Sequence, residues 1–170
     1  SRNDPGHPRQ RLEDPAAAAS AATPPDGDHR PQRHRGAEMT QRKAIEELNA
    51  LTERVIGAAI QVHRELGPGL LKSAYSECLA LELKDCGLHA VREVAIPLRY
   101  KSIAVESAYR LDFIVEDAVI IECKAIEQLL PIHSAQVLTY LKLTDKRLGL
   151  LINFNVEVLH KGLKRIANGF

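Results

Sequence analysis

The sequence lacks any long apolar run free of charged residues, so it predicts no membrane-spanning helix. It has only three cysteines, Cys78, Cys86 and Cys123, and their spacing fits neither a paired zinc motif nor a disulfide framework. We therefore expect reduced thiols in a cytoplasmic protein. An excess of charge of one sign is also missing. The formal net charge of +1 argues against a general nucleic-acid coating protein, although it is compatible with a small basic groove.

Large apolar residues are almost absent from residues 1–38, where Leu12 is the only one. Such a segment cannot bury enough surface to offset the entropy lost when it becomes ordered. We therefore expect a disordered tail over residues 1–38 and one folded domain over residues 39–170. Met39, the only methionine, marks this boundary. Either Met39 is the natural first residue and the tail is not native, or the tail is a genuine flexible extension.

The spacing of apolar residues after the tail predicts the order helix, helix, three strands, helix, strand. Gly67-Pro68-Gly69 ends the first helix, and Gly87 ends the second. Pro97 indicates an edge position or a bulge in the first strand. The order predicts an α/β protein with a small mixed β-sheet flanked by helices. The expected helices cover residues 45–66, 71–86 and 132–143, and the expected strands cover residues 91–100, 108–115, 118–125 and 149–154, with residues 156–166 left ambiguous.

The two central strands are mostly apolar, but they contain two acids and a lysine that could meet: Asp112, Glu122 and Lys124. If Val115 pairs with Val119 across the turn, Asp112 lies opposite Glu122, with their β-carbons about 5 Å apart. Two carboxylates that close repel each other unless a cation lies between them. Glu122 and Lys124 share one face, because side chains alternate along a strand. The pattern predicts a divalent-metal site with a lysine beside it.

Asp112 together with Glu122-Cys123-Lys124 resembles the core motif of the PD-(D/E)XK nuclease superfamily. Residues 51–166 resemble the small bacterial and archaeal group called GxxExxY proteins, through the strings VHRELGPGLLKSAY, YRLDFIVEDAVIIECKAI, IHSAQVLTYLKLT and GLLINFN. The resemblance implies a restriction-endonuclease-like core and metal-dependent hydrolysis of phosphodiester bonds in DNA or RNA, with Mg²⁺ or Mn²⁺. It also implies that Asp112, Glu122 and the backbone carbonyl of Cys123 hold the ion, and that Lys124 orients the attacking water.

Gln136 and Tyr140 resemble the Q-x-x-x-Y helix of the exonuclease branch of the superfamily, and we expect both to act in catalysis. Residues four apart share a helix face, so both side chains can face the site. The alternative is that Tyr140 is a core aromatic residue and Gln136 pairs locally. His63 and His133 fall in segments that resemble the group's motifs, and either could carry a proton or contact a phosphate. A satisfied or exposed histidine is the other interpretation of each.

The motif that names the group is Gly, two residues, Glu, two residues, Tyr. Gly69 and Tyr75 fit this pattern, but Lys72 stands where the glutamate belongs. In the superfamily this helix acid helps to hold the metal, and a charged lysine cannot do so. Glu77 does not substitute for it, because it lies about 140° further around the helix.

Lys72 therefore has two interpretations. Its ammonium group could neutralise Asp112 and Glu122 in place of a metal ion, since its helix stripe continues through Leu79 and Leu83 toward the core. Alternatively, it is a solvated surface lysine. The main apolar stripe that the spacing gives this helix comprises Leu71, Ala74, Cys78 and Leu81.

Three functions stay open on these grounds. The first is a metal-dependent nuclease, and the second is a catalytically impaired member of the superfamily that binds nucleic acid or protein. The third is an obligate homodimer that buries the apolar helix stripe. Nucleic acid is the expected partner in the first case, and no membrane is involved in any of them.

Overall fold

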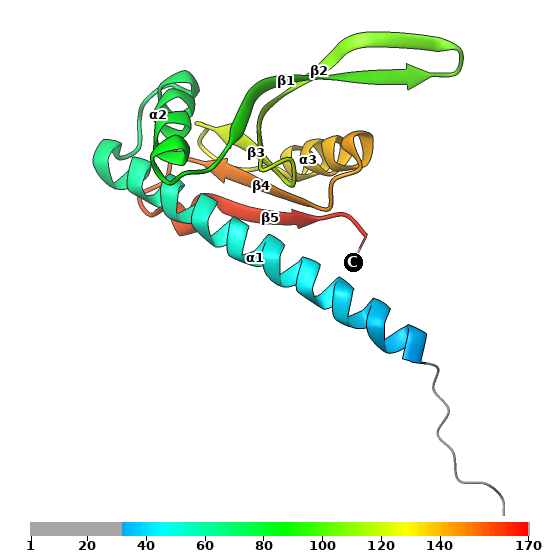
Figure 1. Ribbon diagram of the computed structural model, residues 1–170. Helices are drawn as coiled ribbons and strands as arrows, with labels where there is room; N and C mark the ends of the chain where they lie inside the picture. Colours follow the sequence, from blue (N-terminus) through cyan, green and yellow to red (C-terminus); the bar gives the residue numbers. More distant parts are fainter. Residues whose placement is uncertain (1–31, 170) are drawn as a thin grey trace, which may run out of the picture.

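The computed structural model describes residues 32–169, which form one mixed β-sheet with helices on both faces (Figure 1). Two helices, α1 (Gln32–Leu66) and α2 (Lys72–Asp85), pack against one face, and α3 (Pro131–Thr144) packs against the other. The predicted α/β fold with a small mixed sheet is confirmed. The sheet has five strands in sequence order: β1 (Ala90–Tyr100), β2 (Ile103–Val115), β3 (Val119–Lys124), β4 (Leu148–Asn153) and β5 (Leu163–Ala167).

The central strands β3 and β4 run parallel to each other, whereas the other neighbouring pairs are antiparallel. Both strands are covered on two faces, and they are apolar except for Glu122 and Lys124 in β3 and Asn153 at the end of β4. Ile121 and Cys123 of β3 join the larger core beneath α1 and α2. Ile120 of β3 and Leu151 of β4 join the smaller core beneath α3. The middle of the sheet is thus a rigid platform between two apolar layers.

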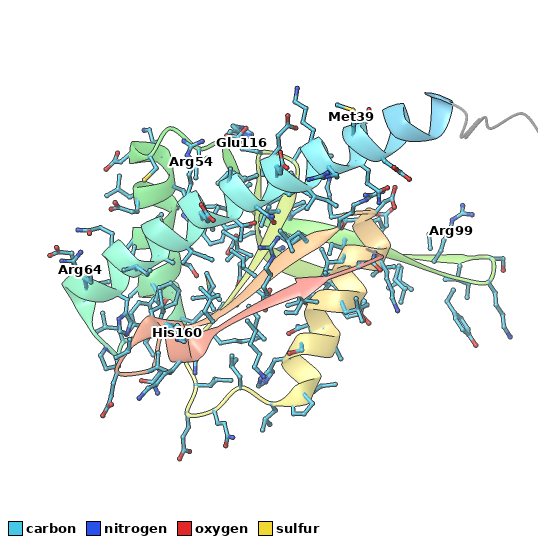
Figure 2. The ribbon with its side chains drawn as sticks, turned by 90° about the horizontal axis from the view of Figure 1, so that it is seen from below. Met39, Arg54, Arg64, Arg99, Glu116 and His160 are labelled. Atoms are coloured by element: carbon cyan, nitrogen blue, oxygen red, sulfur yellow. The ribbon has the colours of Figure 1, made fainter. Side chains whose placement is uncertain are left out.

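The hairpin of β1 and β2 extends well beyond the rest of the sheet (Figure 1). Arg99 lies on this projecting part (Figure 2). The register shifts between Ile96 and Leu98, on either side of Pro97, and β1 is the edge strand. The bulge and the edge position predicted from Pro97 are both confirmed. Proline has no backbone N–H, so it fits a position where no ladder hydrogen bond is needed.

Helix α1 begins earlier than the composition suggested. Residues 32–38, expected as the end of the tail, belong to α1, and Met39 lies inside it (Figure 2). The sequence contains no proline between Gln32 and Pro68, so nothing in it breaks the helix. Residues 1–31 lie outside the described part of the chain.

Two further boundaries differ from the predicted ones. Strand β2 begins at Ile103, five residues before the predicted start, because Ile103 pairs with Tyr100 across a tight turn in the projecting hairpin. The ambiguous stretch 156–166 contains a short 3₁₀ helix, η1 (Leu159–Gly162), followed by edge strand β5. Short elements of this kind have too few residues to show a clear period.

Helix α2 buries a different stripe from the main one we expected. Leu71 and Leu81, at the two ends of that stripe, are exposed by 78% and 60%, and Cys78 between them is only partly buried against the core. The buried residues are Tyr75, Leu79 and Leu83, which lie on the line that starts at Lys72. Lys72 therefore points toward the sheet and not away from it. Among residues 32–169, no helix is both long and apolar enough to cross a bilayer.

Candidate functional site

The site lies where β2 and β3 separate. Their ladder pairs Val115 with Val119, as predicted, and ends at the pair Phe113–Ile121. Asp112 follows at the point of separation. Its Oδ2 accepts a hydrogen bond from the backbone N–H of Cys123 at 2.7 Å. The Asp112 carboxylate thus takes the place of the ladder hydrogen bond that the diverging strands no longer make. Its other oxygen, Oδ1, takes no part in this hydrogen bond.

Glu122 is the buried acid of the site. Its side chain is 3% exposed, and Oε1 accepts a hydrogen bond from Nζ of Lys124 at 2.9 Å. Oε2 is buried and has no hydrogen-bond partner among the described residues. Burial raises the pKa of Glu122, the charge of Asp112 raises it further, and the two nearby lysines oppose the shift. A buried carboxylate with one unpaired oxygen is costly, which is typical of a functional position.

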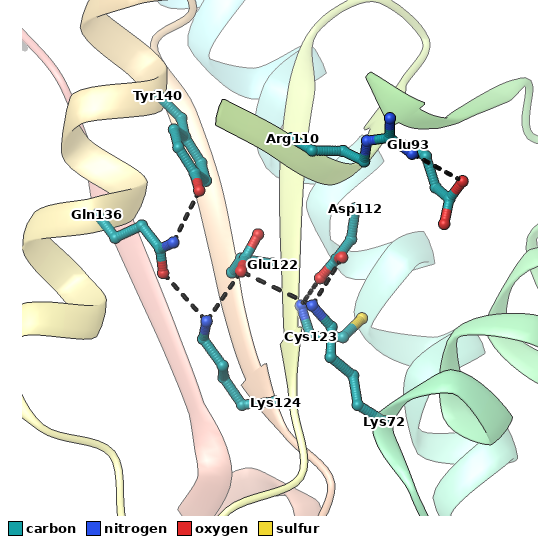
Figure 3. A network of polar contacts seen from close by, with 9 residues as sticks. All are labelled: Lys72, Glu93, Arg110, Asp112, Glu122, Cys123, Lys124, Gln136 and Tyr140. Atoms are coloured by element: carbon teal, nitrogen blue, oxygen red, sulfur yellow. Dashed lines mark hydrogen bonds and ion pairs between the residues drawn. The ribbon is translucent and has the colours of Figure 1, made fainter. Parts of the chain in front are cut away.

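Lys124 connects the acids to α3 (Figure 3). Its Nζ also donates to Oε1 of Gln136 at 3.0 Å, and Nε2 of Gln136 donates to the hydroxyl of Tyr140 at 2.7 Å. Burial and the charge of Glu122 raise the pKa of the Tyr140 phenol, so it stays protonated. Gln136 is thereby fixed at both ends of its amide, and it holds the Lys124 ammonium in place.

An open cavity of about 360 Å³ adjoins this chain of hydrogen bonds. Its walls are Tyr109 of β2 and one face of α3, including Gln136 and Tyr140. The two tyrosine rings meet edge to face, with centroids 5.7 Å apart. The cavity therefore borders the network at its Gln136–Tyr140 end, with the two tyrosines in its wall.

Lys72 approaches the acids from the opposite side, at the start of α2 (Figure 3). Its Nζ lies 2.8 Å from Oδ1 of Asp112 and 3.9 Å from Oε1 of Glu122. Burial alone would lower the pKa of Lys72, but the hydrogen bond with Asp112 and the charges of both acids hold the pKa above its usual value. Lys72 is thus a charged member of the site and not a surface lysine that turns away.

The other two motif positions shape the loop that delivers Lys72. Gly69 has φ of +101°, a conformation that L side chains rarely adopt. The hydroxyl of Tyr75 donates to the carbonyl of Gly67 at 2.6 Å and accepts from the N–H of Leu70 at 3.1 Å. The Tyr75 ring stacks on Phe154, with centroids 4.7 Å apart. Tyr75, expected as a site neighbour, therefore uses its polar atom in the loop.

The two candidate histidines lie apart from the acids. Nε2 of His63 is 2.7 Å from the carbonyl oxygen of Val156, and the ring is buried. Nδ1 of His133 accepts from the N–H of Leu130 at the start of α3, while the ring lines the cavity beside Gln136. His133 is thus the nearer of the two to the network, and His63 has a structural contact.

Sequence reasoning missed Arg92 as a site neighbour. Its guanidinium group binds both oxygens of Glu77, at 2.8 and 2.5 Å, and lies 5.7 Å from the centre of the Phe113 ring. Arg92 and Glu77 also line a second cavity, of about 200 Å³, that reaches Lys72 and Asp112. The signal was a basic residue near the start of a predicted strand, and that start pairs with Phe113, the neighbour of Asp112. Glu77 does not replace the missing helix acid, since Arg92 binds it.

The sequence resemblance implies a divalent metal ion at this site, and such an ion requires several converging ligands. In the part of the chain that the structure describes, no three His, Cys, Asp or Glu side chains converge as a ligand set. Asp112 and Glu122 do converge, and the unpaired Oε2 of Glu122 is the kind of hard oxygen donor that Mg²⁺ and Mn²⁺ prefer. Oxygen donors of the right kind are therefore present, but only two side chains supply them, and the ammonium group of Lys72 already contacts one of the two.

Comparison with protein families shows which family the chain belongs to. Residues 49–166 match the model of the PD-(D/E)XK nuclease superfamily. The chain therefore belongs to the PD-(D/E)XK nuclease superfamily, whose fold suggests nuclease-like phosphodiester hydrolysis. Searches of curated proteins and of solved structures found no match.

Proposed function

We propose that this protein hydrolyses phosphodiester bonds of DNA or RNA at the Asp112–Glu122–Lys124 site, with Mg²⁺ or Mn²⁺ as cofactor. The supporting observation is the convergence of two carboxylates and an ammonium group at the fork between β2 and β3. Membership of the superfamily supports the reaction class. GxxExxY membership is part of the proposal, and it rests on the motif strings and on the loop built by Gly69 and Tyr75.

Asp112, Glu122 and the backbone carbonyl of Cys123 would hold the ion. When bound, such an ion would polarise a phosphate oxygen and would lower the pKa of a water molecule. Lys124 offsets negative charge that develops on the phosphate, because its ammonium group is held rigidly by Glu122 and Gln136. Tyr140 acts by holding Gln136, since its protonated hydroxyl is not a base.

The second candidate is a catalytically impaired member that binds nucleic acid or protein without cutting. It is favoured by the 2.8 Å contact between Lys72 and Asp112, which already neutralises that acid. In this case the two lysines would contact backbone phosphates as fixed charges, and no metal would be needed.

One assay separates the two candidates. Mixed single- and double-stranded DNA and RNA are incubated with MgCl₂, MnCl₂ or EDTA, and binding is measured in parallel. A nuclease loses cleavage in Asp112→Asn and in Lys124→Ala, while Asp85→Asn, an exposed acid at the end of α2, cuts like wild type. Absence of cleavage with either metal, together with binding that survives both site changes, would instead support the binding module.

Assembly and location remain predictions. A homodimer would double the apparent mass in size exclusion with light scattering, and a monomeric mass would rule it out. The cytoplasmic location still rests on the reduced cysteines, and fractionation of cells would test it.

A further inference from the structure

Lys72 holds an unfavourable position unless the two acids compensate it. It is the first residue of α2, and the first turn of this helix contains no acidic residue. The positive end of the helix dipole disfavours a cation there. The side chain is also only 42% exposed, so part of its hydration is lost. Asp112 and Glu122 supply the charge that offsets both costs.

The local charges are already balanced without a metal. Two carboxylates, Asp112 and Glu122, face two ammonium groups, Lys72 and Lys124. A divalent ion added to this group would bring two uncompensated positive charges into a partly buried space. It would also lie within repulsive range of Lys72, whose Nζ is in contact with Oδ1 of Asp112.

The packing of α2 fixes the contact between Lys72 and Asp112. Lys72 lies on the same line of the helix as Tyr75, Leu79 and Leu83, which are fully buried. The Tyr75 hydroxyl fixes the preceding loop through Gly67 and Leu70. The start of α2 is therefore anchored, and its first side chain is aimed at the acids.

We propose that the Lys72 ammonium group is a tethered cation that occupies the place of a divalent ion between Asp112 and Glu122, so that a metal binds only when Lys72 is displaced. This rests on the proposed function, because it concerns the metal requirement of that site. It predicts a weak metal site in the wild-type protein and a stronger one when the ammonium group is removed.

Calorimetry with MnCl₂ and MgCl₂ on four proteins tests the proposal. Lys72→Met removes the competing charge, and Lys72→Glu also adds a third carboxylate. Lys84→Met is the matched control, since Lys84 is an exposed lysine of the same helix. We expect Mn²⁺ to bind Lys72→Met at least about tenfold more tightly than wild type, a change equal to about 1.4 kcal/mol. Lys72→Glu binds more tightly still, and Lys84→Met behaves as wild type.

Thermal unfolding gives a second measurement. With EDTA, Lys72→Met melts below wild type because Asp112 has lost the ammonium group that neutralises it, and MgCl₂ restores part of the difference. The wild-type melting temperature rises less with MgCl₂ than that of Lys72→Met. Lys72→Arg keeps the charge and behaves as wild type, which covers the case in which the other variants fail to fold. Equal Mn²⁺ affinity in wild type, Lys72→Met and Lys72→Glu overturns the proposal, as does a wild-type melting temperature that rises with MgCl₂ as much as that of Lys72→Met.

The two proposals fail in different ways. If metal affinity rises in the Lys72 variants but no variant cuts nucleic acid, the tethered cation stands and the nuclease proposal falls. If wild type cuts with Mg²⁺ and its metal affinity equals that of Lys72→Met, the nuclease stands and the tethered cation falls.

Discussion

Asp112 binds the backbone N–H of Cys123 with one carboxylate oxygen and Lys72 with the other. The same side chain therefore joins β3 to β2 and α2 to the sheet. Removing it should affect both the fold and the chemistry of the site. Different replacements of Asp112 separate its effect on stability from its effect on the chemistry of the site.

Asp112→Ala should be clearly less stable than Asp112→Asn. Asparagine keeps an oxygen that can accept from Cys123, whereas alanine leaves that N–H without its partner at the end of the ladder. An unsatisfied buried donor costs about 1–3 kcal/mol. Urea unfolding of both variants measures the difference, and equal stabilities would show that the hydrogen bond contributes nothing. Both variants should lose any cleavage, because both lose the carboxylate charge.

Tyr75→Phe should destabilise the protein by about 1–2 kcal/mol through the loss of hydrogen bonds. The ring keeps its stack on Phe154, but the loop loses the hydroxyl that binds Gly67 and Leu70. Urea unfolding measures the change. Tyr100→Phe, on the projecting hairpin, is the control because Tyr100 is exposed. A Tyr75→Phe protein as stable as this control would contradict the structural role of the hydroxyl.

Cys86 and Cys123 should differ in their reactivity toward alkylating reagents. Cys86 is exposed and Cys123 is buried, and burial with the charge of Asp112 raises the pKa of the Cys123 thiol. The thiolate is the reactive form, so Cys123 is protected twice, by its protonation and by its position. Alkylation followed by peptide mass spectrometry should label Cys86 in the folded protein, and Cys123 only after denaturation. Labelling of Cys123 in native protein would contradict its burial.

The Glu77–Arg92 pair should contribute to stability only above acid pH. The two hydrogen bonds from Arg92 hold the pKa of Glu77 below its usual value. Such a contribution is present above the ordinary pKa of 4.5 and is lost as the pH falls through the lower folded-state value. Unfolding free energies of wild type and Glu77→Gln should therefore differ at neutral pH and converge in acid. A constant difference across this range would show that the ion pair is not its cause.

The fold was predictable because its central strands carry unusually clear signals. The apolar runs around Ile120 and Leu151 predict buried strands, and Pro97 predicts the bulge at the edge. The pair Val115–Val119 was predictable from the turn between them, and it placed Asp112 near Glu122 in advance. Local pattern and tertiary structure agree here, so the prediction needed no other information.

Other features could not be predicted from the sequence, because they depend on the direction of single side chains. Two stripes of α2 have similar apolar content, and only packing against the sheet selects the one with Tyr75 and leaves Leu81 exposed. That choice also decides where Lys72 points. The role of the Tyr75 hydroxyl likewise depends on how the loop folds back, and a motif pattern contains no such geometry.

The hydrogen bond between Asp112 and Cys123 stabilises the fold, because β2 and β3 would fray without it. We therefore expect Asp112 to be retained even in a relative that no longer cuts nucleic acid. Glu122 makes no such hydrogen bond to a backbone group: its Oε1 binds Lys124, and its Oε2 has no partner among the described residues. When related chains are compared, a change at the position of Glu122 should therefore be the more sensitive sign that hydrolysis has been abandoned.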